Sequence, residues 1–599
     1  MAVDAGDGDW LLRVAATNIY DYLTDTTDLS TARGGGIALL RAITDVVQPL
    51  VERADGMPVS TGASEGVFLL PKLDADAAGD FARRLWRQLL SGGRPDAGAD
   101  DGGLRDALRH ATFTVSIRPV AGGYGATVER LVADGRLAQL RNPTLAVPAM
   151  QPPPKRQTDT AVCRVDRRRP AATRIARKGE VNVPVSWAVR DRRRFGVRQK
   201  QRFYVEELEH GIRVPAVPAD FAGRFALQTD DPPWLAESRD AMAAWLDAGG
   251  RRFLRGQEVD EGAPDQPASP PFAYDFTNVA AGGAYPRLDG KLAVLYADGN
   301  GFGAAQRRLI AAAPDGAAEQ FRLDRLLKAY RRDLLFRIVR SAKAAFEAGG
   351  EAQWDWVSDA EVGAGPKVPQ LRLETLLWGG DEIIWVMPAW LGFRVMRLFA
   401  EATLGLGAGS GGAWTLDREP LHHGVGLVFC GHKAPIARVQ KLARSLGDMA
   451  KEDKLERKRG RSLIAFETLE SFDHLGSAPE TARTRRCPEG LTSDDLLLDA
   501  AALPAFLDTV DAIKRAGLPR RRLRRLVEDL YREIAIEQAE EAFRKRLRPE
   551  AAALLAPHLA ALPGLVGPLS DEAARRRLAW LQLEAVWDYV APGVRDADD

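Results

Sequence analysis

Apolar residues recur along the chain at two spacings, one typical of strands and one typical of helices. Stretches of the two kinds follow one another in a segment at residues 285–478. Alternating or continuous apolar runs of four to eight residues predict strands, whereas apolar residues three or four positions apart predict helices. The segment shows, in order, a strand, two helices, two strands joined by a Gly-Gly turn, a helix, a strand and a helix, at 291–297, 304–313, 322–348, 371–388, 389–403, 422–430 and 435–458. This order predicts a ferredoxin-like sheet with additions.

An earlier segment, residues 1–150, repeats this plan in outline. It shows a strand and turn, a glycine-rich helix, a hairpin, a helix and a strand, at 11–23, 33–52, 62–71, 76–90 and 111–120. The period is too long for a solenoid, so duplication of one domain fits better. The predicted fold class is therefore α+β, with two ferredoxin-like domains.

Two further regions complete the organisation. Residues 151–284 are rich in Pro and Arg, and proline clusters at 152–154 and 264–271 look like borders. Residues 479–599 carry apolar residues at helical spacing, which predicts an all-helical C-terminal domain.

Composition is that of a soluble globular protein, with 45% hydrophobic and 28% charged residues. No run approaches the length of a membrane span, and the acidic N-terminus does not resemble a signal peptide. We therefore expect a cytoplasmic protein without a membrane partner. Three scattered cysteines, Cys163, Cys430 and Cys487, are too few for a disulfide framework or a four-thiolate zinc site, so no zinc is expected.

The net charge is only +1, but basic residues gather in the middle region. Between Lys155 and Arg202 there are sixteen Lys and Arg residues against four Asp and Glu, with aromatic residues interleaved. Such a stretch could neutralise phosphates of RNA, and a solvated, partly disordered basic loop is the alternative.

The candidate chemistry lies where strands end on carboxylates. Asp298 follows the buried strand at 291–297, and Asp381 and Glu382 occupy the later hairpin turn. In a ferredoxin-like sheet that strand and hairpin are neighbours, so these carboxylates should converge. Clustered carboxylates repel one another unless a cation neutralises them, and oxygen ligands alone favour Mg²⁺ or Mn²⁺.

Glycines surround these acids. Gly299, Gly301 and Gly303 would leave backbone N–H groups open to a triphosphate at the start of a helix. Gly379 and Gly380 permit a tight hairpin and leave room for a sugar or base. Two divalent ions held here would polarise a 3′-hydroxyl and stabilise leaving pyrophosphate.

The stretches LYADGNGFG and LLWGGDEIIWVMP resemble the palm domain of GGDEF nucleotide cyclases and, more closely, of the large polymerase/cyclase subunit of type III CRISPR complexes. That subunit also carries two palms, the first degenerate, and the stretch from Ile19 to Leu40 is similar to the opening of its first palm. The resemblance covers 285–470 well and 10–130 weakly. It implies an inserted variable domain, a helical C-terminal domain and partner subunits.

The resemblance also implies roles for residues. Asp298, Asp381 and Glu382 would be the catalytic metal ligands, Glu382 standing where the family usually has aspartate. The loop around Asn300 and Phe302 would line the nucleotide, and Asn300 replaces a second acidic residue of many relatives.

Other implied roles lie outside the carboxylate cluster. Lys451 would contact the nucleotide phosphates, with Arg461 as a helper or merely as a basic residue favoured at a helix end. In the first palm, Gly34, Gly35 and Gly36 could seat a second triphosphate, or could serve close helix packing. Glu65 is the only acid at the first hairpin, so no catalytic metals are expected there. The chain has no His-Asp dipeptide, and no HD nuclease activity is expected.

These features predict a nucleotidyltransferase that joins nucleoside triphosphates, by analogy ATP, into a cyclic oligonucleotide for antiviral defence, under the control of RNA or partner subunits. One alternative is a non-catalytic RNA-binding scaffold that uses the basic region. Another is a GTP-using diguanylate cyclase, although such enzymes usually pair two identical palms from a dimer.

Overall fold

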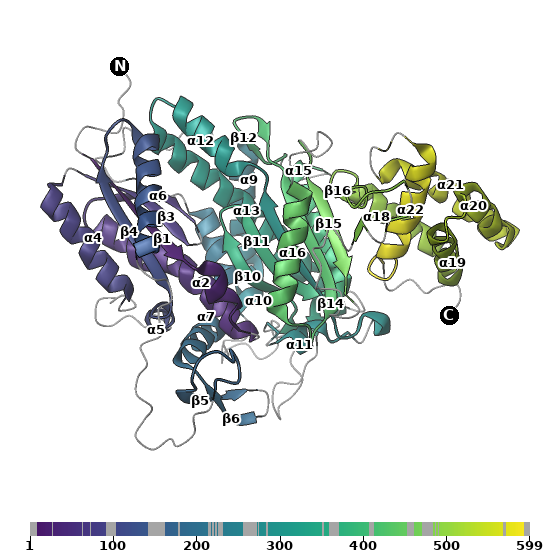
Figure 1. The fold of residues 1–599 in the computed structure, drawn as a ribbon, viewed down its shortest axis with the longest axis horizontal. Coiled ribbons are helices and arrows are strands. Elements are labelled where there is room, and N and C mark those ends of the chain that lie inside the picture. Colours follow the sequence, from purple (N-terminus) through teal and green to yellow (C-terminus); the bar gives the residue numbers. More distant parts are fainter. Residues whose placement is uncertain are drawn as a thin grey trace.

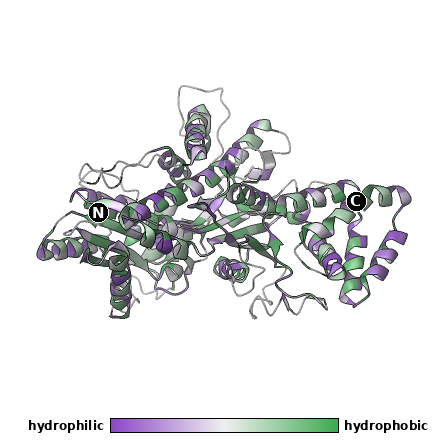
Figure 2. Ribbon diagram, turned by 90° about the horizontal axis from the view of Figure 1, so that it is seen from above, coloured by the Kyte–Doolittle hydropathy of each residue, from purple (hydrophilic) through white to green (hydrophobic). Residues whose placement is uncertain are grey.

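The computed structural model describes residues 9–26, 28–62, 64–71, 73–90, 103–141, 162–177, 180–213, 217, 221, 225, 232–255, 272–273, 275–282, 285–349, 353–358, 370–406, 412–451, 460–469, 483–484, 487–488, 490–566, 569 and 571–591. The N-terminal elements lie at one end of an elongated molecule, the longer sheet at its centre and the C-terminal helices at the other end (Figure 1). The strands of both sheets are mostly hydrophobic (Figure 2).

The first sheet contains four antiparallel strands in the order β2-β3-β1-β4. These strands are β1 (Trp10–Thr17), β2 (Met57–Thr61), β3 (Glu65–Leu70) and β4 (Thr112–Pro119). Its helices are α1 (Ile19–Thr24), α2 (Leu29–Arg41), a π-helical turn (Ala42–Val47), α3 (Gln48–Glu52), α4 (Ala75–Leu90), α5 (Leu104–Leu108) and α6 (Tyr124–Arg141). Leu11, Leu12 and Val14 of β1 are fully buried, as a central strand requires.

The second sheet repeats this order and extends it, as β10-β11-β7-β14-β15-β16. Its strands are β7 (Lys291–Gly299), β10 (Glu374–Gly379), β11 (Glu382–Pro388), β14 (His423–Gly431), β15 (Leu463–Thr468) and β16 (Leu498–Asp499). Its helices include α12 (Phe302–Ala312), α13 (Gly316–Ala348), α14 (Gln353–Trp356), α15 (Gly392–Leu404) and α16 (Ile436–Lys451). Both sheets thus have the strand order that the sequence pattern predicted, within a mixed α+β fold.

Strand alternation divides the residues of the second sheet between two cores. Leu295 and Leu427 pack on one face in the core that contains Phe393 of α15. Val294 and Tyr296 face the other way, into a core shared with Ala443 of α16. Side chains two residues apart on β7 therefore lie under α16, and this places Tyr296 and Asp298 on the same face.

The middle region is built around α7 (Trp187–Ile212), which packs along α2 and also contacts α13. The other elements are β5 (Thr173–Arg177), β6 (Glu180–Val185), α9 (Pro233–Trp245), a π-helical turn (Leu246–Gly250), α10 (Arg251–Arg255) and α11 (Phe276–Ala280). Residues 155–161 and 178–179 of the basic stretch lie outside the described residues.

The alternative of a solvated basic loop is wrong for residues 187–202, because several of these cations are buried in ion pairs. Arg192 is fully buried and its guanidinium lies 2.8 Å from Asp25. Lys200 lies 2.9 Å from Glu374 of β10, which Arg33 of α2 also contacts. These buried pairs therefore join α7 to the segment between α1 and α2 and to β10 of the second sheet.

Close packing between α2 and α7 explains one group of glycines. The helix begins at Leu29, so Gly34, Gly35 and Gly36 lie inside it and not at its start. A Cβ on Gly34 would come within 1.9 Å of the Arg192 carbonyl oxygen. A Cβ on Gly36 would come within 2.5 Å of the Leu376 carbonyl oxygen in β10. The expected triphosphate seat at these glycines is therefore wrong, and helix packing is their role.

The C-terminal helices begin after β16, which pairs with β15, so the second sheet continues beyond residue 479, where the sequence placed a border. These helices are α18 (Leu503–Arg515), α19 (Arg520–Tyr531), α20 (Ile536–Lys545), α21 (Pro549–Ala561) and α22 (Glu572–Val586). In the described residues from 503 onward the regular elements are all helical, as predicted.

One helical run, Leu29–Glu52, is long and apolar enough by length and composition to cross a membrane, and 61% of its most apolar window is buried inside the protein. Packing against α7 and β10 accounts for its apolar character. The three cysteines form no disulfide.

Candidate active site

Three carboxylates lie at one end of the second sheet, where β7 meets the β10–β11 hairpin. Asp298 ends β7 and Glu382 begins β11, and the two strands pair with Ala297 opposite Ile383. Asp381 occupies the hairpin turn after Gly380, whose φ of +28° favours glycine. The prediction that this strand and hairpin are neighbours is therefore confirmed by the strand order.

Tyr296 joins two of these carboxylates. Its phenol oxygen lies 2.9 Å from Asp298 Oδ2 and 3.0 Å from Glu382 Oε1. A phenol donates one proton, so it satisfies one carboxylate at a time while both remain directed at the same point. Sequence reasoning missed Tyr296, although its position two residues before Asp298 on a strand was a usable signal.

Two cations from α16 cover the carboxylates. Lys451, at the end of the helix, contacts Asp298 Oδ2. Arg444 Nη2 lies 2.6 Å from Glu382 Oε1, and its guanidinium carbon lies 5.4 Å from the centre of the Tyr296 ring. Lys451 was predicted near the site, and the structure brings it there. Arg444 was missed, although seven residues before Lys451 is the same helix face.

The electrostatics of the site show that negative charge is crowded. Burial raises the pKa of Asp381 to about 6, and the charges of Asp298 and Glu382 add to this effect while Lys451 opposes it. Burial also raises the pKa of Asp448 on α16. The site would therefore bind an additional cation favourably, because Lys451 and Arg444 do not offset all of the negative charge.

The donor set suits a hard divalent cation, although the carboxylates are not preassembled around one. Among the described residues, no group of three His, Cys, Asp or Glu side chains is close enough to hold a metal ion. The carboxylates of Asp298 and Glu382 converge on one atom, however, and Asn300 Oδ1 is buried and accepts no hydrogen bond. Carboxylate and amide oxygens are the ligands that Mg²⁺ prefers. These residues fit such an ion once Lys451 moves away from Asp298.

The turn after β7 is only partly as expected. The Asn300 N–H donates to the His422 carbonyl oxygen at 2.8 Å, and Gly301, with φ +69°, begins α12 without a side-chain cap. Gly303 lies in the first turn of that helix, with open space around it except for Arg307. An uncapped helix start at this place leaves backbone N–H groups for an anion.

Three predicted residues have other roles. Phe302 is buried, with its ring centre 5.1 Å from that of His423, so its side chain packs in the core, and a contact between Phe302 and a nucleotide stays a prediction. A Cβ on Gly299 would come within 2.5 Å of the Phe302 ring, so this glycine makes room for the ring. Arg461 contacts Asp499 of β16, and this pairing accounts for it without a role as a helper of Lys451. At the hairpin, Gly379 is buried in β10 and Gly380 is exposed at the tip.

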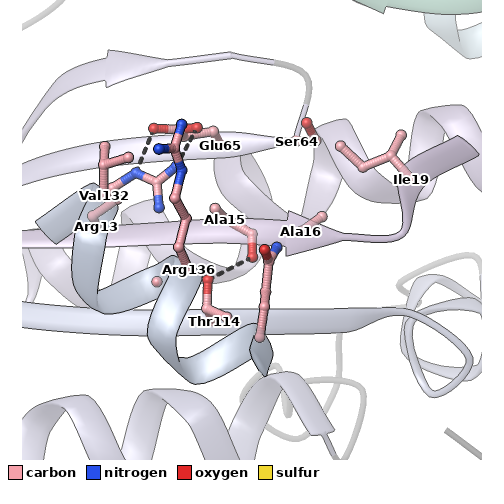
Figure 3. Close-up of a pocket in the computed structure, with 11 residues that line it drawn as sticks. Arg13, Ala15, Ala16, Ile19, Ser64, Glu65, Thr114, Val132 and Arg136 are labelled. Carbon is pink, nitrogen blue, oxygen red and sulfur yellow. Dashed lines mark hydrogen bonds and ion pairs between the residues drawn. The ribbon is translucent and has the colours of Figure 1, made fainter. Parts of the chain in front are cut away.

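The first sheet has a counterpart of this site with different chemistry. Ala15 stands opposite Glu65 where the second sheet brings Asp298 beside Glu382, and Arg13 occupies the position of Tyr296. The Arg13 guanidinium binds the Glu65 carboxylate through two bonds of 2.6 and 2.7 Å (Figure 3). This pair neutralises Glu65 without a metal ion.

A cavity of about 200 Å³ lies beside the Arg13–Glu65 pair (Figure 3). Its lining residues come from β1, α1, β3, β4, α6 and the β2–β3 turn, and include Arg13, Ser64, Glu65, Thr114, Arg136 and Gln139. The first sheet therefore offers a cavity of mixed polar and apolar lining, with two arginines, at the place that corresponds to the carboxylate cluster of the second sheet.

No protein-family model and no curated protein matches the sequence. Among solved structures, the chain resembles a Csm1–Csm4 cassette in complex with cA4, with 13% identity over 98% of this chain and 70% of the other, and a TM-score of 0.47. The same cassette in complex with pppApApA gives 13% identity, the same coverage and a TM-score of 0.44. Csm1 of T. onnurineus gives 14% identity over 97% of this chain and 70% of the other, with a TM-score of 0.40. These neighbours are structures of Csm1, the large subunit of type III CRISPR complexes, which is the family that the motifs at Asp298 and Asp381 resemble.

Proposed function

We propose that this chain is a metal-dependent nucleotidyl cyclase or oligonucleotide synthetase that joins nucleoside triphosphates into a cyclic oligonucleotide signal. The observation that carries the proposal is the convergence of Asp298 and Glu382 on the Tyr296 phenol, beside Asp381 at the tip of a glycine hairpin. A scaffold has no need of three carboxylates crowded at a sheet end, because their repulsion destabilises the fold.

In the proposed reaction a 3′-hydroxyl oxygen attacks the α-phosphorus of a second nucleotide and forms a P–O bond. The bond from that phosphorus to the oxygen bridging to the β-phosphate breaks, pyrophosphate leaves, and the hydroxyl proton passes to solvent water. Mg²⁺ or Mn²⁺, bound by Asp298, Asp381 and Glu382, would polarise the hydroxyl and offset charge on the leaving group. Lys451 would exchange its contact with Asp298 for one with the triphosphate. Arg444 and Tyr296 would hold Glu382 in place throughout.

The second nucleotide requires a seat near the first sheet. The cavity beside Arg13 and Arg136 is the best candidate in the part of the chain that the structure describes, because two arginines line it and it lies at the position matching the carboxylate site. Its Glu65 is already paired with Arg13, so this seat would bind its nucleotide without catalytic metal.

ATP is the substrate to test first. The ligands named for the Csm1–Csm4 structures include cA4, pppApApA, AMPPNP and ATP. The proposal extends to use of the product in antiviral defence, to the partner subunits of a CRISPR-type complex and to a cytoplasmic location.

RNA is the proposed regulator, and one observation supports it. Arg194 and Arg202 are exposed on α7, and the Arg190 guanidinium stacks 3.9 Å from the centre of the Trp187 ring at the start of that helix. Exposed arginines and arginine–aromatic stacking on one helix are features that RNA-binding proteins use, and α7 carries both. The scaffold alternative uses the same surface without catalysis.

The decisive experiment incubates the purified chain with each labelled nucleoside triphosphate and Mg²⁺ or Mn²⁺, with and without RNA. The test variant is Asp381→Ala, Glu382→Ala, and its control is Asp74→Ala, Asp76→Ala, which removes two exposed acids from the start of α4. Pyrophosphate release and a cyclic product that only the test variant loses would support the proposal. Product from GTP alone would favour a diguanylate cyclase. Tight RNA binding without product under any condition would favour the alternative of a non-catalytic RNA-binding scaffold.

A further inference from the structure

One face of α13 contacts the hairpins of both sheets. Asp324 and Lys328 reach the end of β2 in the first sheet: Asp324 Oδ1 accepts from the Ser60 hydroxyl and the Thr61 N–H at 3.3 Å each, and Lys328 contacts Thr61 Oγ1. Arg331, one turn further along, lies under Trp378, which precedes the hairpin turn that carries Asp381. The spacing of 324, 328 and 331 places these side chains on one helix face.

Arg331 is an unusual member of this face. It is only 5% exposed, and its Nε and Nη1 atoms are buried without a hydrogen-bond partner. Its guanidinium carbon lies 5.2 Å from the centre of the Trp378 ring. Buried guanidinium donors that lack acceptors destabilise a protein, so such an arrangement calls for an explanation.

The acids near Arg331 have other partners. Glu207 accepts from the Trp378 indole at 3.0 Å and from Arg332 at 3.3 Å. Asp324 is bonded to Lys328 and to the β2 backbone. Burial lowers the pKa of Arg331 to about 10, an effect that Glu207, Asp324 and Asp381 oppose, so the group remains charged at neutral pH. Arg331 therefore interacts electrostatically with these acids, but among the described contacts it donates no hydrogen bond to any of them.

We infer that Arg331 binds a phosphate group of a nucleotide held between the two hairpins. This inference rests on the proposed function, and it names a residue outside both sequence motifs. α13 joins the β2–β3 and β10–β11 hairpins through Asp324, Lys328 and Arg331, so a nucleotide held between these hairpins would lie against this helix face. Arg331 has two N–H donors there without a partner. Guanidinium groups bind phosphate through two parallel hydrogen bonds, and a stacked Trp378 holds the group in orientation.

The test compares Arg331→Met and Arg331→Gln with Arg340→Met, which removes an exposed arginine from the same helix. The probe is ATP with Mg²⁺, measured by calorimetric binding and by the shift in melting temperature that ATP causes. Both Arg331 variants should bind ATP at least tenfold more weakly and should raise KM more than they lower kcat. Without ATP they should melt at or above the wild-type temperature, because a desolvated charge has been removed.

Wild-type affinity for ATP in either folded Arg331 variant would overturn the inference. So would a lower melting temperature of the ATP-free variants combined with unchanged binding, because it would show a purely structural role. If the wild-type chain neither binds ATP nor makes a product, the proposed function itself fails, and this outcome is distinguished by the wild-type measurement alone. Arg340→Met should match the wild type in every readout.

Discussion

Lys451 at the end of α16 contacts the carboxylate of Asp298 at the end of β7. In the proposed function a divalent cation needs the same carboxylate, so the lysine and the metal ion compete for it. Lys451→Met should therefore bind Mn²⁺ more tightly than the wild type without nucleotide, by about tenfold, which corresponds to about 1.4 kcal/mol. The same variant should bind ATP more weakly, since Lys451 is the proposed phosphate contact.

Electron paramagnetic resonance of free Mn²⁺ measures the first effect, and calorimetry measures the second. The control is Lys441→Met, which removes an exposed lysine from the same helix and should change neither. Equal Mn²⁺ affinity in Lys451→Met and the wild type would show that the lysine does not occupy the cation position.

Tyr296→Phe removes the hydroxyl shared by Asp298 and Glu382 and leaves the ring that packs under α16. Hydrogen bonds to charged groups contribute about 1.5–3 kcal/mol, so the rate of product formation should fall by about 10- to 100-fold. The fold should persist, since the ring still contacts Arg444. Initial rates and near-UV circular dichroism test both statements. Tyr531→Phe, on exposed α19, should keep the wild-type rate, and an unchanged rate in Tyr296→Phe would exclude the phenol from the site.

The part of the site that could be predicted depends on local rules. A strand that ends on Asp298 and a hairpin that carries Asp381 are read from periodicity and turn residues, and ferredoxin-like order brings them together. Tyr296 and Arg444 obey equally local rules, two residues along a strand and seven along a helix. They could have been found by asking which side chains share a face with the predicted ligands.

The parts that could not be predicted depend on contacts between distant residues. Arg192 pairs with Asp25, 167 positions away, and no local pattern distinguishes a buried arginine of α7 from a solvated one. Gly34 is small because the Arg192 carbonyl lies against it, and a glycine run alone does not separate this role from phosphate binding. For Phe302 the apolar character indicated the core while a motif suggested a ligand contact, and the structure shows the core position.

Glu374→Gln tests the buried junction that joins β10 to α2 and α7. Glu374 is almost fully buried and contacts Arg33 and Lys200, which would lose their countercharge. Breaking a buried ion pair from one side destabilises a protein by about 3–5 kcal/mol. Urea unfolding followed by tryptophan fluorescence should show this loss. Asp80→Asn, which breaks an exposed pair with Arg83, should leave the midpoint unchanged. Equal midpoints for both variants would mean that the junction contributes little.

Gly34→Ala and Gly125→Ala place the same methyl group in two helices with opposite expected results. At Gly34 the Cβ would clash with the Arg192 carbonyl, and overpacking of this kind destabilises by about 1–3 kcal/mol. At Gly125, near the start of α6, no atom lies within 4 Å of the Cβ position, so alanine should stabilise by up to about 1 kcal/mol. Thermal unfolding distinguishes the signs. A neutral Gly34→Ala would show that α2 and α7 can separate without loss of stability.

His423 makes the fold sensitive to acid. Its ring packs among Phe302, Phe399 and Trp414, and its Nδ1 atom is buried without a hydrogen-bond partner. Burial lowers the pKa of His423 to about 3, an effect to which His422 and Lys451 add. In the unfolded chain this histidine has a pKa of about 6.5. Between about pH 6.5 and about pH 3 the unfolded chain therefore binds a proton at His423 that the folded chain does not bind. Stability contributed by neutral His423 is present above about pH 6.5 and is lost as the pH falls toward 3.

Between pH 7 and pH 5 this single group should lower the free energy of unfolding by about 2 kcal/mol. His423→Leu removes the titration, so its stability should fall less than that of the wild type over this interval, whatever its stability at pH 7. Urea unfolding at the two pH values gives the difference directly, and the other titrating groups cancel in the comparison. His558→Leu, in α21 of the C-terminal module, should retain the wild-type dependence on pH. An equal loss of stability in His423→Leu and the wild type between pH 7 and pH 5 would contradict this prediction. It would mean that acid acts on the fold through other groups, and that His423 can be protonated without disrupting the aromatic residues around it.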